Sequence, residues 1–247
     1  MLKNVFYIFV VALFWQSCHY KNYLVSSKVK SYSIDSQANS TVLDSIIEPY
    51  RNKIEKQMNE TIAVLDVDLK KEQPESTMGN LVADLMMNYC KDAKIDADFA
   101  VVNYNGLRIP NIAKGNLARG KVFELMPFDN QVVVLELDSI LIQKTCDAMA
   151  QKGGWHISKG LAYEIKNAKA QNIKIFGTLL NTKTKYKVMM SDYIANGGDN
   201  CSFLTSVKQN VINVLIRDLL LIQIEAKTKK GEHLISQLDK RCVLVKN

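Results

Sequence analysis

Apolar residues recur at a helical period in two long segments of the first half of the chain. In residues 42–58 they lie three or four positions apart, with Tyr50 and Ile54 among them, which predicts a helix with one apolar face. The segment 75–93, ESTMGNLVADLMMNYCKDA, repeats this period over several turns. We therefore expect two amphipathic helices here, the second packed on a core.

Shorter apolar runs between and after these helices predict strands. TIAVLDVDL, residues 61–69, alternates apolar and polar positions, as a half-buried strand does. DFAVVN, residues 98–103, is a short apolar run suited to a buried strand. QVVVLEL, residues 131–137, is a third expected strand.

The second half of the chain mixes strand-like and helical patterns. In chain order we expect a turn-containing stretch at 122–130, a helix at 138–151, strands at 161–168, 172–178 and 185–190, and closing helices at 202–208 and 212–227. Helices that alternate with strands, together with hairpins in the second half, predict an α+β fold of mixed sheets and packed helices. No internal repeat or low-complexity linker interrupts this pattern, so we expect one domain over residues 41–247.

The N-terminus has the pattern of an export signal. MLKNVFYIFVVALFWQSC places Lys3 before an apolar core that ends at Trp15, well short of the ~20 residues needed to cross a bilayer. The end of this segment resembles a bacterial lipoprotein signal, in which Cys18 is the lipidated residue. Cleavage elsewhere with ordinary export is the alternative. We expect a signal at 1–18, a polar tether at 19–40, and a protein lipid-anchored in the outer membrane or periplasm.

Composition narrows the class of protein. The chain is 47% hydrophobic and 23% charged, which is ordinary for a globular protein. Its net charge of +7 is spread out, without the concentrated basic stripe of a nucleic-acid groove. We therefore expect no nucleic-acid partner.

Four cysteines follow the signal, at spacings too wide for a metal knuckle. Cys90 and Cys146 fall among apolar residues of helical segments, where a buried thiol is the common explanation. An exported protein also allows a disulfide, but the sequence does not pair Cys90, Cys146, Cys201 and Cys242.

The chain lacks the motifs of a self-contained catalytic centre. Its three histidines, His19, His156 and His233, are isolated, whereas a dinuclear hydrolase needs several histidines and carboxylates that share two metals. No nucleophile elbow, phosphate-binding loop or dinucleotide-binding glycine pattern occurs. We expect neither a metal nor a cofactor bound by this chain.

Polar and aromatic residues at predicted strand ends are the remaining candidates for a binding site. Asn103 offers a donor and an acceptor, Arg108 offers a rigid fork of donors for an anion, and Phe128 and Tyr193 offer two ring faces for a flat guest. Each also has a purely structural explanation: loop hydrogen bonding for Asn103, a surface ion pair for Arg108 and core packing for Phe128.

The segment SDYIANGGDN combines Tyr193, a glycine pair and Asp199. Glycine permits positive φ or a close backbone approach, and a carboxylate accepts hydrogen bonds from sugar hydroxyls. A surface turn is the simpler alternative, since Gly-Gly-Asp is common turn chemistry.

Four blocks occur in an order that resembles the C-terminal domain of the 5'-nucleotidase family. They are ESTMGNLVADLMM, ADFAVVNYNGLRIP, GKVFELMPFDNQVVVLEL and YKVMMSDYIANGGDN. In that family the domain binds the nucleoside, and a preceding metallophosphoesterase domain holds two metals and cleaves the phosphate. The resemblance implies that Phe128 and Tyr193 clamp the base, that Asn103 approaches the base, that Asp199 accepts from ribose hydroxyls, and that Arg108 meets the phosphate.

Three departures from the family pattern qualify these roles. Tyr104 and Asn105 stand where the family has glycines, and Asn200 stands where the last glycine of Gly-Gly-Asp-Gly is usual. No metallophosphoesterase domain precedes the matched region in this sequence. We therefore expect a nucleotide-recognition chain that works with a separate metallophosphoesterase chain carrying the divalent metals. The alternatives are a stand-alone nucleoside- or nucleotide-binding surface lipoprotein and a scaffold that has lost its ligand.

Overall fold

The computed structural model describes residue 31 and residues 41–245. The expected signal at 1–18, its Cys18 and nearly all of the tether at 19–40 lie outside these described residues. The chain divides into a unit Met1–Ile47 and a compact unit Glu48–Asn247. Within the described ranges, no helix has both the length and the hydropathy needed to cross a bilayer.

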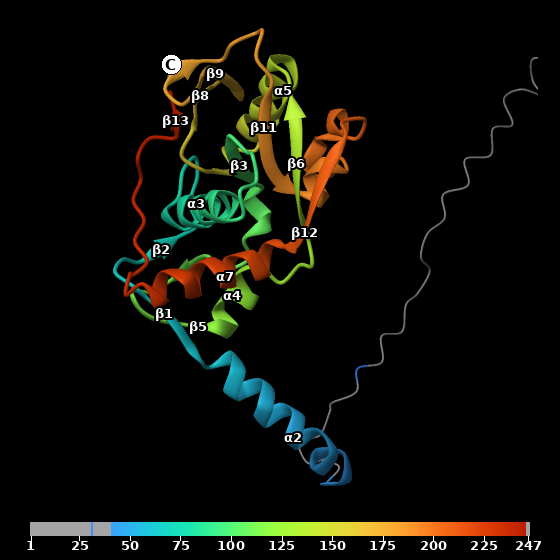
Figure 1. Cartoon of the computed structure of the whole chain (residues 1–247), viewed down its shortest axis with the longest axis vertical. Coiled ribbons are helices and arrows are strands. Elements are labelled where there is room, and N and C mark those ends of the chain that lie inside the picture. The colour runs from blue at the N-terminus through green and yellow to red at the C-terminus, as the bar shows by residue number, and fades with distance from the viewer. Residues whose placement is uncertain (1–30, 32–40, 246–247) are drawn as a thin grey trace, which may run out of the picture. The chain divides into compact units, whose positions relative to one another are not determined.

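The fold is α+β, as the sequence predicts. The helices are α2 (Thr41–Met58), α3 (Thr77–Asp92), α4 (Arg119–Leu125), α5 (Ser139–Gln151), α6 (Asp192–Ala195) and α7 (Ile216–Lys229). Short 3-10 turns occur at Tyr104–Gly106, Gly198–Asn200 and Ser202–Leu204. Figure 1 shows α4 and α7 side by side below α3, in keeping with the packing of α4 on α7.

Four sheets make up the β-structure of the described residues. The largest has the strand order β12 (Gln209–Leu215), β6 (Gln131–Leu137), β11 (Tyr186–Ser191), β3 (Phe99–Val102) and β7 (His156–Ile157). A second sheet has the order β10 (Thr178–Leu179), β9 (Lys169–Ile175), β8 (Leu161–Lys166) and β13 (Cys242–Leu244). Two small ladders pair β1 (Thr61–Leu65) with β5 (Gly115–Ala118) and β2 (Leu69–Lys70) with β4 (Asn111–Ile112).

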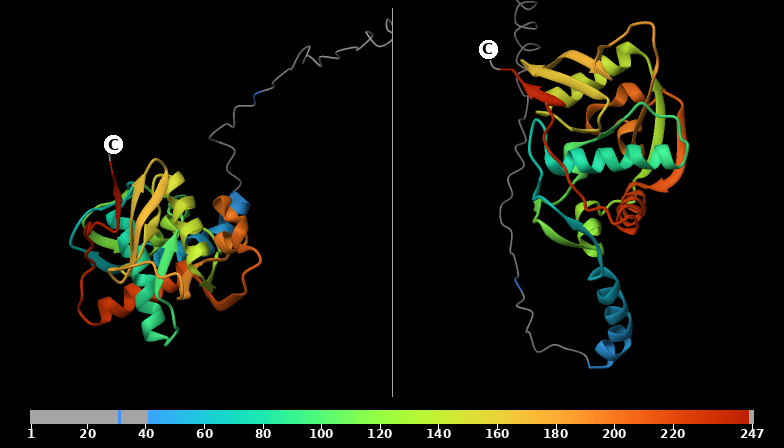
Figure 2. Two further views of the ribbon diagram at one scale, coloured as in Figure 1. Left: turned by 90° about the horizontal axis from the view of Figure 1, so that it is seen from above. Right: turned by 60° about the vertical axis from the view of Figure 1, so that its left-hand side comes forward.

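The five-stranded sheet is covered on both faces. Val132 and Val134 of β6 belong to a core formed with α3 and α7, whereas Val133 and Leu135 face a second core formed with α5, β8 and β9. This alternation explains the apolar run of β6, because each face of the strand meets its own layer. Figure 2 shows the C-terminal segment, in red, leaving α7 and ending beside the yellow hairpin, where β13 pairs with β8.

Most of the predicted helices and strands occur at their expected places. The main differences lie where strand pairing competes with the local hydrophobic pattern. The expected strand 61–69 is two strands separated by a bend. The stretch 122–130 starts as the end of helix α4. The expected helix 202–208 is only a 3-10 turn, and the helix predicted from residue 212 begins at Ile216, because residues 209–215 pair with β6 as strand β12.

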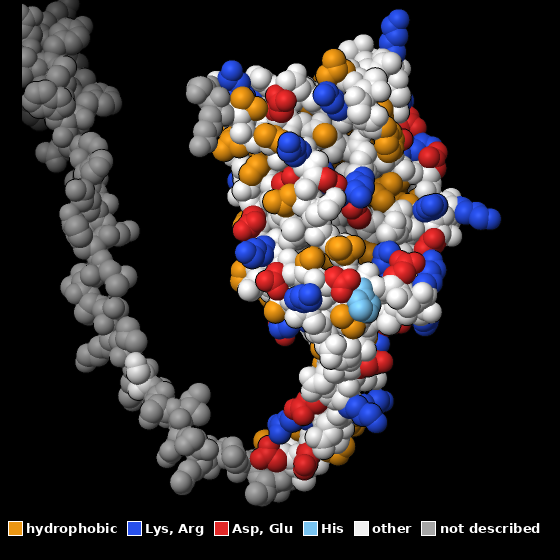
Figure 3. All heavy atoms as spheres, turned by 90° about the vertical axis from the view of Figure 1, so that its left-hand side faces the viewer, with side chains coloured by type: hydrophobic (Ala, Val, Ile, Leu, Met, Phe, Trp, Pro, Cys, Tyr) orange, Lys and Arg blue, Asp and Glu red, His pale blue; other side chains and the backbone are white. Residues whose placement is uncertain are grey.

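The four cysteines of the described residues are free and buried, which confirms the thiol interpretation for Cys90 and Cys146. Burial raises the pKa of the Cys90 and Cys201 thiols to about 11, so both are protonated and unreactive at neutral pH. On the face drawn in Figure 3, basic and acidic side chains are interspersed and form no stripe of one sign.

Candidate functional site

Strand directions bring the predicted site residues to one edge of the five-stranded sheet. β3 and β11 are parallel, and β6 runs antiparallel to β11. The C-terminal ends of β3 and β11 therefore meet the N-terminal end of β6. Asn103 follows β3, Tyr193 follows β11, and Phe128 precedes β6.

A cavity of about 270 Å³ lies at this edge and is lined by loop residues. We call it the loop cavity; its lining residues are Asn103, Asn105, Gly106, Arg108, Phe128, Asn130, Tyr193 and Asp199. All five residues selected from the sequence are among them. The structure thus brings together side chains that are up to 96 positions apart in the chain.

Asn103 and Asp199 are joined directly across the cavity. Asn103 Nδ2 donates a hydrogen bond to Asp199 Oδ2 at 2.6 Å, and Asn103 is almost fully buried. Gly106 makes this arrangement feasible, because a Cβ at that position would lie 2.7 Å from Asn103 Oδ1. Glycine at position 106 is therefore required for a steric reason.

The glycine pair of SDYIANGGDN serves two separate needs. Gly197 has φ 94°, in the left-handed region where side chains are strained. Gly198 accommodates the aromatic ring of Tyr193, since a Cβ there would lie 2.5 Å from ring atoms. Asp199 and Asn200 also have positive φ, at 50° and 69°, residue types that tolerate this region better than most.

Both aromatic rings are accessible and are not turned into a core. Phe128 is 37% exposed and Tyr193 is 46% exposed. The Arg108 guanidinium carbon lies 5.3 Å from the centroid of the Phe128 ring, a cation–π contact. A flat guest in the cavity would thus meet exposed ring surface from two different loops.

Asp192 links these two loops. Its Oδ1 accepts from the backbone N–H of Gln131 at 3.1 Å and from that of Tyr193 at 2.8 Å. On the other side, the Asn130 carbonyl accepts from the Ile216 N–H at 3.0 Å, at the start of α7. The segment carrying Phe128 is therefore tied both to the Tyr193 segment and to a core helix.

A pair of cations lies beside the loop cavity. Lys71 Nζ lies 4.1 Å from the Tyr104 ring centroid and donates to the Leu107 carbonyl at 2.8 Å. Burial, and secondarily the charge of Arg108, lowers the pKa of Lys71. Neither Lys71 nor Arg108 has a carboxylate partner among the described residues. This local excess of positive charge favours an anion.

The described part of the chain contains no cluster of side chains that could bind a metal ion. No group of three or more histidine, cysteine or acidic side chains there is close enough to hold an ion. His156 is buried, and its Nδ1 lies 3.1 Å from Ser76 Oγ, while burial lowers its pKa to about 3. It is a neutral core residue that packs on Gly79, where a Cβ would collide with its ring.

Sequence reasoning did not select three residues that shape the site. Asn130 belongs to the PFDN stretch and lines the same cavity as Phe128, but an asparagine in a turn has no distinctive sequence signal. Lys71 lies 37 positions before Arg108 and approaches it only through the pairing of β2 with β4. Asp192 precedes Tyr193 in the quoted segment, and only the register of β6 with β11 places it beside Gln131.

The chain matches one known protein family over more than half of its length. Residues 58–206 match the model of the 5'-nucleotidase C-terminal domain. The match includes all five residues chosen from the sequence.

Individual relatives agree with this result. The chain is 27% identical over 191 residues to a 5'-nucleotidase of Vibrio vulnificus, covering 73% of this chain and 34% of that protein. It is 26% identical over 182 residues to the trifunctional nucleotide phosphoesterase YfkN of Bacillus subtilis, covering 64% of this chain and 12% of that protein. The matched part of the chain therefore spans about a third of the Vibrio protein and about an eighth of the Bacillus protein.

A solved structure has the same fold. The 5'-nucleotidase precursor of Thermus thermophilus superposes with a TM-score of 0.72 at 22% identity, over 83% of this chain and 43% of that chain. At this identity the likeness concerns the fold.

Proposed function

The chain belongs to the 5'-nucleotidase family through its C-terminal domain, and from this premise we propose that the domain recognises the nucleoside part of a nucleotide. The observation that carries the proposal is the loop cavity, in which two exposed aromatic rings and a fixed carboxylate line one space. In this role Phe128 and Tyr193 stack on the base, and Asp199 accepts from the ribose hydroxyls.

Different lining groups contribute different interactions with the nucleotide. Stacking of a base on an aromatic ring contributes ~1–3 kcal/mol and tolerates any base. Hydrogen bonds to a charged acceptor contribute about 1.5–3 kcal/mol, so Asp199 supplies selectivity for a sugar with hydroxyls. Arg108 and Lys71 attract the phosphate, because their charges lack a carboxylate partner in the described chain.

Hydrolysis in this proposal takes place with a separate metallophosphoesterase chain. The loop cavity, at about 270 Å³, lies at the lower end of the ~300–1,000 Å³ typical of small-molecule sites. The described residues also offer no cluster of metal ligands. The partner would supply the divalent metals and the opposite wall, and this chain would position the nucleotide.

Calorimetry tests the recognition step. The full chain is titrated with AMP, adenosine and ribose 5-phosphate, and the titrations are repeated with Phe128→Ala and Tyr193→Ala. We expect AMP to bind more tightly than ribose 5-phosphate, and each variant to weaken AMP binding about tenfold. Equal binding of AMP and ribose 5-phosphate, or no change in either variant, would remove the stacking role.

Reconstitution tests the partnership. The chain is mixed with a metallophosphoesterase chain from the same source, and phosphate release from AMP is followed with and without EDTA. We expect activity only in the mixture, lost with EDTA and with Arg108→Ala. Tight binding of AMP by the isolated chain, with no gain of activity on mixing, supports the alternative of a stand-alone nucleotide-binding lipoprotein.

The proposal places the chain at the cell envelope, anchored through lipid on Cys18. Its basis is the N-terminal pattern of Lys3, an apolar core and Cys18. Mass spectrometry of the mature protein should find acyl chains on Cys18, and Cys18→Ser should move the protein to the soluble fraction. If mass spectrometry instead finds an unmodified N-terminus at another residue, the protein is exported without lipidation.

A further inference from the structure

A second and larger cavity lies at the opposite edge of the five-stranded sheet. It measures about 630 Å³, within the range typical of small-molecule sites. We call it the lysine cavity; its lining residues are Lys94, Ile95, Asp96, Val134, Glu136, Lys185, Lys187, Val207, Lys208, Asn210 and Ile212. None of them lines the loop cavity.

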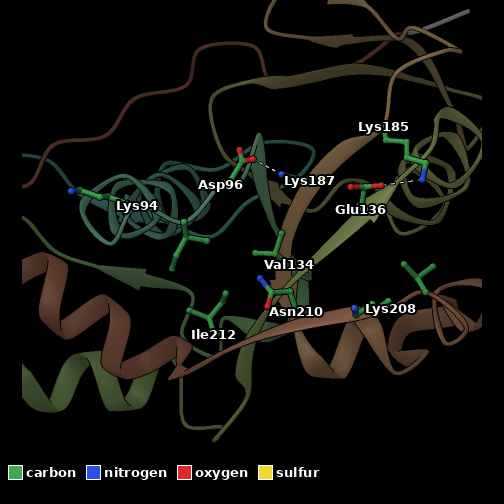
Figure 4. Close-up of a pocket in the computed structure, with 11 residues that line it drawn as sticks. Lys94, Asp96, Val134, Glu136, Lys185, Lys187, Lys208, Asn210 and Ile212 are labelled. Carbon is green, nitrogen blue, oxygen red and sulfur yellow. Dashed lines mark hydrogen bonds and ion pairs between the residues drawn. The ribbon is translucent and has the colours of Figure 1, made fainter.

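The cavity forms where the helical layer stops covering the sheet. Val134 belongs to the core under α3 and α7, and Glu136, two residues further along β6, lies on the same face beyond that core. Ile95 follows the end of α3, and Ile212 belongs to β12. Together with Val134 they give the cavity an apolar side. Figure 4 shows Val134, Asn210 and Ile212 close together in this region.

A row of charged side chains crosses the sheet beside this apolar surface. Lys187 of β11 is paired in register with Glu136 of β6. On the other side of β6, Asn210 of β12 is paired with Val134, and Lys208 immediately precedes β12. Lys187, Glu136 and Lys208 therefore line the same cavity from three neighbouring segments.

Most of these charges are already compensated. Lys187 forms an ion pair with Asp96, and Lys185 forms one with Glu136 at 3.0 Å. Lys94 points away from Val134 and Asn210 (Figure 4). Neither Lys94 nor Lys208 has a carboxylate partner among the described residues. Of these two cations, Lys208 is the one that lies on the same side of the cavity as the Asn210 amide (Figure 4).

From this arrangement we infer that the lysine cavity is a second ligand site, for a small organic monoanion with an apolar body. The anionic group pairs with Lys208 and accepts from Asn210, while the apolar body covers Ile95, Val134 and Ile212. A dianion is disfavoured because Asp96 and Glu136 border the same space. The site does not depend on the nucleotide role of the loop cavity.

Two dyes of similar shape and different charge test this inference. Anilinonaphthalene sulfonate carries one anionic group, and N-phenylnaphthylamine has the same rings without it. The full chain, labelled with nitrogen-15, is titrated with each. We expect the sulfonate to bind more tightly, to weaken with added salt, and to shift the backbone amide signals of Asp96, Val134 and Asn210. Shifts confined to other regions, or equal affinity for both dyes, would overturn the proposal.

A matched pair of variants separates a built site from general positive charge. Lys208→Gln removes the uncompensated cation on the Asn210 side, and Lys144→Gln removes an exposed lysine of α5 outside the cavity. We expect Lys208→Gln to weaken sulfonate binding about fivefold, as for one partly exposed charge contact, and Lys144→Gln to leave it unchanged. Equal effects of the two variants would mean nonspecific attraction and would refute the site. Both side chains are exposed, so both variants should fold.

Discussion

The side-chain amide of Asn103 donates a 2.6 Å hydrogen bond to Oδ2 of Asp199, joining the end of β3 to the loop after α6. The bond fixes one carboxylate oxygen. The other, Oδ1, has no hydrogen-bond partner in the described part of the chain. Asp199 lines the loop cavity, and a carboxylate held in this way can accept a hydrogen bond from a guest through its second oxygen without further ordering of the side chain.

Asp199→Ala should therefore reduce affinity for nucleotides according to their sugar. We expect at least a tenfold loss for AMP and little change for its 2',3'-dideoxy analogue, since only the former donates to Asp199. Isothermal titration of both ligands against both proteins measures this difference. Asp199→Asn serves as a control that keeps the size of the side chain. Equal losses for the two ligands would place Asp199 in a structural role.

Gly198 should be needed for the position of the Tyr193 ring. Gly198→Ala would bring a Cβ to 2.5 Å from that ring and to 2.6 Å from the Tyr193 carbonyl oxygen, so the ring and the local backbone must move. We expect it to weaken AMP binding as much as Tyr193→Ala does, and the double variant to be no worse than either single one. Additive losses in this double-mutant cycle would show that the two residues act independently.

The hydrophobic pattern of the chain predicts helices and strands correctly where the local sequence and the tertiary contacts favour the same structure. Helix α3 has the period and burial expected of it, and strand β3 is buried as its apolar run predicts. Helix α2 has the period, yet Tyr50 is 70% exposed and Ile54 is 56% exposed. Periodicity thus predicts the helix and says nothing of what covers its apolar face.

The predicted secondary structure is wrong where long-range strand pairing determines the conformation. Val211 and Ile212 can extend the helical pattern that follows them, but residues 209–211 pair with β6, and Asn213, at φ 56°, bulges the strand. The site shows the same limit. The order of motifs selects Phe128, Tyr193 and Asp199, whereas the link through Asp192 requires the register of β6 on β11, which no local pattern contains.

Asp192→Ala should loosen both aromatic loops at once. Its carboxylate accepts from the N–H groups of Gln131 and Tyr193, so its loss frees both segments. Hydrogen exchange should become faster at these two amides, and AMP affinity should fall although Asp192 is not among the residues that line the cavity. Asp138→Ala is the matched control, because Asp138 caps α5 through the Leu141 N–H at 2.8 Å. It should cost about 1 kcal/mol of stability and leave affinity unchanged. Similar affinities in the two variants would contradict the link.

His156 should make the fold less stable in acid. Burial lowers its pKa from 6.5 to about 3, so between these values the unfolded chain binds a proton that the folded chain does not. The free energy of unfolding therefore falls as the pH drops below the ordinary pKa, and the full contribution is present only above it. Between neutral pH and about pH 5 the loss should be on the order of 2 kcal/mol.

Urea unfolding at a series of pH values measures this loss, with His156→Gln as the comparison. Glutamine keeps a polar group near Ser76 Oγ but does not titrate, so the variant starts less stable and loses less on acidification. The difference between the two slopes isolates the imidazole from the carboxylates that also titrate in acid. Parallel slopes for the two proteins would mean that water reaches the ring of His156 and that its proton binding is the same in the folded and unfolded chains.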